Sequence, residues 1–83
     1  MAEHAPQLIE GIDKAKAGEW DAAHAIAQSL EGNAHADWLH AILHKIEGDE
    51  RNSRYWYGRT NQNYESYPDA EAELDALKAV LTY

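Results

Sequence analysis

The chain has 83 residues, of which 15 are acidic and 7 are basic, and it contains no cysteine. This length predicts a single domain over residues 1–83 with one thin core. The absence of cysteine excludes disulfides, thiolate metal ligands and a cysteine nucleophile. The net charge of −8 argues against nucleic acid or an anionic membrane as a partner. No apolar run approaches the roughly 20 residues that span a bilayer, and the first ten residues do not resemble a secretory signal. We therefore expect a cytoplasmic protein.

Helical spacing of apolar residues predicts five helices in chain order. Glycine ends the first three, Asp49 caps the fourth, and Pro68 begins the fifth after a polar loop at 60–67. The first four expected ranges are about 6–16, 19–30, 34–47 and 50–60. In the third range, four residues at positions i, i+3, i+4 and i+7 form the expected buried stripe, namely Leu39, Ile42, Leu43 and Ile46.

An internal repeat joins these helices in pairs. Residues 16–20 (K-A-G-E-W) and 46–50 (I-E-G-D-E) place a glycine and an acid between two helices at an offset of 30 residues. Stacked helical hairpins of this kind form solenoids, and the architecture resembles the tetratricopeptide superfamily in its corners and in small residues such as Ala23. We expect an all-α fold of two antiparallel helical hairpins with a C-terminal capping helix.

A second resemblance covers more specific motifs. Residues 38–60 read W-L-H-A-I-L-H-K-I-E-G-D-E-R-N-S-R-Y-W-Y-G-R-T, and residues 20–24 read W-D-A-A-H. They resemble a family of small, uncharacterised bacterial proteins with a W-D-x-A-H element, a His-rich helix and E-G-D-x-x-N-x-x-Y-W-Y-x-R. Ser53 and Thr60 stand where that family's pattern has alanine. The resemblance implies a shared fold and no particular activity.

One sector of the third segment carries side chains that could bind a metal ion. His40 and His44 are spaced i, i+4, and His44 and Glu47 are spaced i, i+3, so they share one surface. With His24 or Asp37 as a further ligand, they could bind zinc or another divalent metal. They could also support general acid–base catalysis. The alternative is a structural role, in which these histidines donate hydrogen bonds to Glu47, to tyrosine hydroxyls or to a neighbouring helix.

The fourth segment is aromatic, and one of its faces could bind a ligand or partner. In a chain without Phe, the alternative is that Trp56 and Tyr57 belong to the core. The functional hypothesis is a shallow groove between the third and fourth segments that takes a peptide or a small anion. Its expected residues come from both segments: His40, His44, Glu47, Asn52, Tyr55, Trp56 and Arg59.

The repeat, the acidic surface and the absence of a catalytic motif favour a non-catalytic interaction module without a cofactor. It would bind a protein or a basic peptide, and a homodimer would bury aromatic rings that so small a core leaves exposed. The alternative function is a metal-binding or metal-dependent protein that uses His40, His44 and Glu47, with His24 as a further ligand. A third hypothesis is a pH-responsive interface that uses the five histidines.

Overall fold

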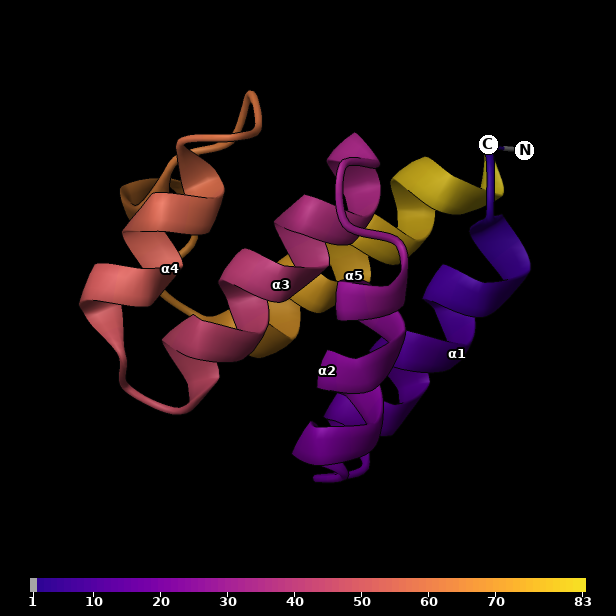
Figure 1. Ribbon diagram of the computed structural model, residues 1–83, viewed down its shortest axis with the longest axis horizontal. Coiled ribbons are helices and arrows are strands. Elements are labelled where there is room, and N and C mark those ends of the chain that lie inside the picture. Colours follow the sequence, from indigo (N-terminus) through magenta and orange to yellow (C-terminus); the bar gives the residue numbers. More distant parts are fainter. Residues whose placement is uncertain (1) are drawn as a thin grey trace.

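The computed structural model describes residues 2–83. These residues form α-helices and one short 3-10 helix, and no strand occurs among them. The all-α prediction is therefore confirmed (Figure 1). In chain order the elements are α1 (Ala5–Lys16), α2 (Trp20–Ser29), α3 (Ala34–Ile46), α4 (Glu50–Tyr57), η1 (Tyr64–Ser66) and α5 (Ala70–Thr82).

The elements pack as two helical hairpins and a C-terminal helix. Helix α1 pairs with α2, α3 pairs with α4, and α2 packs against α3 to join the hairpins. Helix α5 lies against α1 and α3, where it buries Leu74, Leu77 and Leu81. It therefore covers the apolar face that the hairpins leave open, as expected. Among residues 2–83, no helix combines the length and the apolar character needed to cross a membrane.

The repeat seen in the sequence is a repeat of backbone geometry. Gly18 and Gly48 have φ angles of 81° and 83°, a left-handed conformation that glycine adopts without steric cost. In both corners the glycine N–H and the next N–H donate to carbonyls of the preceding turn, as in a Schellman motif. The bonds are Gly18 N to Ala15 O (3.1 Å) and Glu19 N to Lys14 O (2.9 Å), matched by Gly48 N to Lys45 O (3.1 Å) and Asp49 N to His44 O (2.9 Å).

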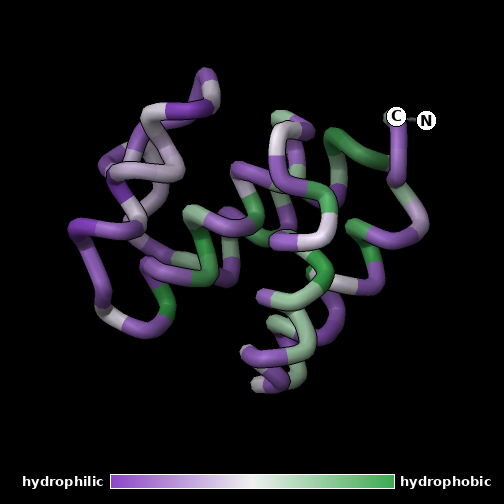
Figure 2. Tube along the Cα trace, viewed as in Figure 1, coloured by the Kyte–Doolittle hydropathy of each residue, from purple (hydrophilic) through white to green (hydrophobic). Residues whose placement is uncertain are grey.

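Helix α3 is the central element, and this changes its predicted burial pattern. It contacts α1, α2, α4 and α5, so every residue from Ala36 to His44 is buried. A single buried stripe was therefore an incomplete prediction. The stripe also ends one turn early, because Ile46 at the end of the helix is 44% exposed. Figure 2 shows the apolar residues on α1, α2, α3 and α5, whereas α4 contributes mainly the rings of Trp56 and Tyr57.

Two predicted boundaries were wrong by two or three residues. Helix α4 ends at Tyr57 rather than at residue 60. Helix α5 begins at Ala70 rather than at Pro68, because the carboxylate of Asp69 accepts a hydrogen bond from the Glu71 N–H (3.0 Å) and caps the helix.

Candidate functional site

Three histidines from two helices meet in the interior, and we call His24, His40 and His44 the imidazole triad. The ring centroids lie 4.6 Å (His24–His40), 5.0 Å (His40–His44) and 5.5 Å (His24–His44) apart. One nitrogen from each ring lies within 4.8 Å of the other two. His40 and His44 are 3% and 8% exposed, and His24 is partly exposed. The i, i+4 spacing thus places two rings side by side on α3, and the packing of α2 adds the third.

Two tryptophans enclose the imidazole triad. Trp56 on α4 stacks on His40 with a centroid distance of 3.8 Å. Trp20 stacks on His24 at 4.7 Å and meets His44 edge-on at 5.8 Å. The indole N–H of Trp20 donates to the Leu43 carbonyl (2.7 Å), which fixes α2 against α3 at this level. The rings are therefore positioned by packing and by a hydrogen bond from a neighbouring helix.

Burial keeps two of these imidazoles neutral. The pKa of His40 is lowered to about 4, first by desolvation and then by repulsion from His24 and His44. The pKa of His24 is also lowered, by desolvation and by His44. A neutral imidazole has a free lone pair on one nitrogen, which is the form that binds a metal ion. These rings are therefore available as ligands at neutral pH.

One fully buried nitrogen of the triad has no hydrogen-bond partner among the described residues. The Nδ1 atom of His40 is buried and unpaired. Buried polar atoms are nearly always paired, because an unpaired one costs about 1–3 kcal/mol of desolvation. A buried, unpaired imidazole nitrogen beside two other imidazoles is a polar atom for which the protein itself supplies no partner.

Glu47 lies behind His44 rather than among the three rings. Its Oε1 atom is 2.6 Å from Nδ1 of His44. This contact assigns the His44 proton to Nδ1 and leaves Nε2 free, as in the carboxylate–histidine–metal arrangement of many metal sites. The other carboxylate near this ring is Asp49, which forms a separate group with His44 and Glu47. Glu47 is therefore placed to orient a ligand rather than to join the triad.

The remaining residues expected in the groove point elsewhere. Asn52 bonds to the Asp49 carboxylate (2.9 Å), and the Tyr55 side chain is 57% exposed. Arg59 lies over the outer face of Trp56, with its guanidinium carbon 5.1 Å from the ring centroid, and forms an ion pair with Asp37 at 3.8 Å. Trp56 stacks directly on His40, so these two residues of the expected groove are in contact with each other. Asp37 is likewise not a member of the group that the three histidines form.

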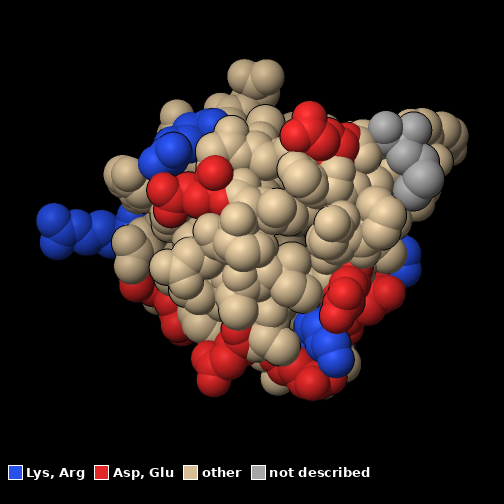
Figure 3. Space-filling model, turned by 45° about the vertical axis from the view of Figure 1, so that its right-hand side comes forward, with Lys and Arg blue, Asp and Glu red and all other residues tan. Residues whose placement is uncertain are grey.

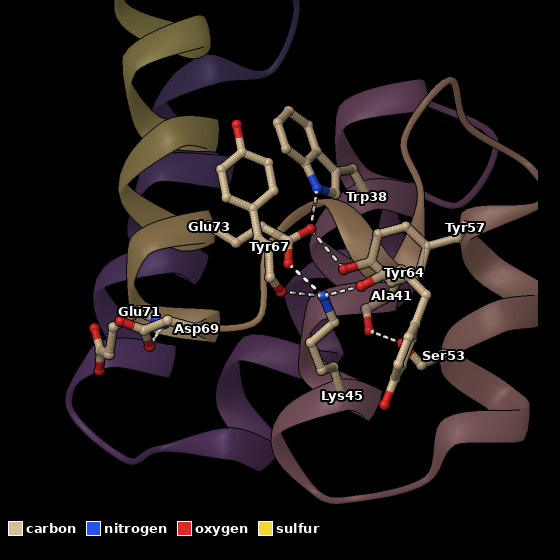
Figure 4. A network of polar contacts seen from close by, with 10 residues as sticks. All are labelled: Trp38, Ala41, Lys45, Ser53, Tyr57, Tyr64, Tyr67, Asp69, Glu71 and Glu73. Carbon is tan, nitrogen blue, oxygen red and sulfur yellow. Dashed lines mark hydrogen bonds and ion pairs between the residues drawn. The ribbon is translucent and has the colours of Figure 1, made fainter.

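A second polar cluster was not predicted from the sequence, and we call it the Glu73 network (Figure 4). Glu73 on α5 is fully buried. Its Oε1 atom accepts a hydrogen bond from the ammonium of Lys45 (2.7 Å). Its Oε2 atom accepts hydrogen bonds from the Trp38 indole N–H (2.7 Å) and the Tyr57 hydroxyl (2.5 Å). The pKa of Tyr57 is raised by burial and by this hydrogen bond. All polar groups of Glu73 are thus paired.

Lys45 connects the Glu73 network to the segment between α4 and α5. Its ammonium also donates to the backbone carbonyls of Tyr64 (2.9 Å) and Tyr67 (3.0 Å), as Figure 4 shows. A sequence signal for this cluster does exist, because Glu73 lies three residues after Ala70 and four before Leu77, on the apolar stripe of its helix. Because its donors and acceptors are satisfied within the protein, the Glu73 network is structural.

In comparisons with protein-family models, curated proteins and solved structures, no match to this chain is found. The resemblance to the bacterial family and the likeness to tetratricopeptide repeats therefore stay predictions.

Proposed function

We propose that this protein binds a divalent transition-metal ion through the imidazole triad. The observation that carries the proposal is the convergence of three histidine nitrogens within 4.8 Å of one another. Zinc–nitrogen bonds of about 2.0–2.1 Å place tetrahedral ligands about 3.4 Å apart. Small side-chain rotations would bring the rings to that spacing. Coordination through Nδ1 of His40 would also give that buried, unpaired nitrogen a partner.

The chemistry of the donors selects the kind of metal. Imidazole suits zinc, copper, nickel and iron, whereas magnesium and calcium prefer oxygen ligands. The chain has no thiolate, which disfavours monovalent copper. Figure 3 shows a face with a broad uncharged centre bordered by Asp and Glu together with some Lys and Arg, and the net charge of −8 attracts cations. A divalent ion of the zinc, nickel, cobalt or copper type therefore fits best.

Metal binding is expected to raise the melting temperature. At a free zinc concentration about 100 times the dissociation constant, binding to the native state adds about 2.7 kcal/mol. In a domain of this size that corresponds to a rise of roughly 10–20 °C. Calorimetry with zinc, nickel, cobalt and copper, after treatment with a chelator, measures the shift. Elemental analysis of the untreated protein shows which metal it carries.

Two variants show whether the shift in melting temperature comes from metal bound at the triad or at another histidine. His24→Ala removes the partly exposed ligand and should abolish most of the shift, since the two buried rings on α3 remain in place. His35→Ala changes a histidine outside the triad and should keep the full shift. The proposal fails if none of the four metals shifts the melting temperature of the unmodified protein, or if both variants behave alike.

We also propose, as a second function, the interaction module expected from the sequence. Tyr55 supports it, because a ring that is 57% exposed beside Arg59 is the kind of side chain that anchors partners. A basic partner should bind more weakly as salt rises, since the protein is acidic. A pull-down at low and high salt, with Tyr55→Ala as the control, measures this. The absence of any partner at low salt would count against it.

A further inference from the structure

We infer that a metal ion in the imidazole triad keeps one coordination position open to water or to a small monodentate anion. This inference rests on the proposed metal binding. Structural zinc sites have four protein ligands, whereas sites with three protein ligands hold a water molecule or substrate in the fourth position. The group formed by His24, His40 and His44 has three members among the described residues. The donor count therefore matches an open site.

The side chains around the triad cannot supply a fourth ligand. The Trp20 indole N–H is already bonded to the Leu43 carbonyl (2.7 Å), and an indole nitrogen donates but does not accept. The same chemistry excludes Trp56, which covers His40. Glu47 is engaged with Nδ1 of His44 at 2.6 Å, and it does not belong to the group formed by the three histidines. A fourth ligand would therefore come from solvent.

The position of His24 indicates where that ligand enters. His40 and His44 are buried beneath the two tryptophans, while His24 is partly exposed. Solvent therefore reaches the triad along the His24 side. Three cavities, of about 330, 580 and 130 Å³, lie over other residues of the described part of the chain. Because the two indoles lie against the triad at centroid distances of 3.8, 4.7 and 5.8 Å, the open position is expected to take a ligand of only a few atoms.

Charge favours an anion at the open position. Three neutral imidazoles leave the two positive charges of the ion uncompensated, and Glu47 acts on it only through His44. In a partly desolvated site, the attraction between the metal ion and a bound anion is stronger than it is in water. The structure therefore fits hydroxide, azide or thiocyanate better than a neutral ligand of the same size.

Cobalt(II) provides the test, because its visible absorption reports the number and kind of its ligands. The full chain is loaded with one equivalent of cobalt and titrated with sodium azide or sodium thiocyanate, with sodium perchlorate as a matched salt that does not coordinate. We expect a saturable shift of the cobalt bands with azide and thiocyanate, no shift with perchlorate, and unchanged cobalt content after dialysis. His35→Ala should behave like the unmodified protein.

The outcomes separate the inference from the proposed function. If cobalt stays bound and neither anion alters the spectrum, the site is closed and the inference is wrong, while metal binding stands. If the anions remove cobalt instead of adding to it, the inference is also wrong. If the protein binds no cobalt, zinc, nickel or copper, the proposed function fails and the inference fails with it.

Discussion

Replacing Glu73 with alanine is expected to lower the free energy of unfolding by about 3–5 kcal/mol, because it leaves the buried ammonium of Lys45 without a carboxylate partner. It also removes the acceptor of the Trp38 indole and of the Tyr57 hydroxyl. Domains of this size have a total stability of roughly 4–12 kcal/mol, so the expected loss is a substantial share of the whole. Urea denaturation followed by far-ultraviolet circular dichroism measures the loss.

Glu71→Ala is the matched control for this experiment. Glu71 lies on the same helix, but its carboxylate is exposed and meets only Lys16, at 3.5 Å. Its removal should change the free energy of unfolding by no more than about 0.5 kcal/mol. Adding Lys45→Met to Glu73→Ala removes the buried charge and should recover part of the loss. Equal losses for Glu73→Ala and Glu71→Ala would show that the Glu73 network does not stabilise the fold.

Acid is expected to destabilise the metal-free protein through His40. Its pKa is about 4 in the folded state, against the ordinary value of 6.5. The unfolded chain therefore binds a proton that the folded protein excludes, and stability is lost as pH falls from about 6.5 towards 4. The difference corresponds to about 2 kcal/mol at pH 5 and about 3 kcal/mol at pH 4. His24, whose pKa is also lowered, acts in the same direction.

The measurement is the free energy of unfolding at pH 7, 5 and 4 in the presence of a chelator. His40→Gln cannot take up this proton, so its stability should fall less steeply with acid than that of the unmodified protein. His35→Gln lies outside the triad and should keep the original pH dependence. An unchanged pH dependence in His40→Gln would contradict the role given to His40.

Local signals in the sequence predicted most of the fold. The two glycine–acid corners are Schellman motifs, whose geometry depends on a few neighbouring residues. The sequence repeat therefore predicted the structural repeat. The start of α5 was placed early because Pro68 and Asp69 both suit a helix beginning, and only the observed bond to the Glu71 N–H decides between them. Such boundaries depend on backbone angles that composition does not determine.

The sequence predicted the site only in part. Some of its contacts join residues within one helix, whereas others join residues far apart in the sequence. The spacing of His40 and His44 was sufficient to place two rings together on α3. The inclusion of His24 depends on the packing of α2 against α3, and the sequence could name it only as one choice beside Asp37. The stacking of Trp56 on His40 likewise depends on how α4 packs against α3, which the spacing within one helix does not predict. The pairing of Lys45 with Glu73 spans 28 residues, which no local pattern reveals.

The three tryptophans divide between the two polar clusters, and this gives the protein built-in optical reporters. Trp20 and Trp56 stack on histidines of the triad. The indole N–H of Trp38 instead donates a hydrogen bond to Glu73, outside the triad. Copper or nickel in the triad would quench the emission of the first two indoles more strongly than that of the third. The intrinsic fluorescence of this chain can therefore report occupancy of the triad without any attached dye.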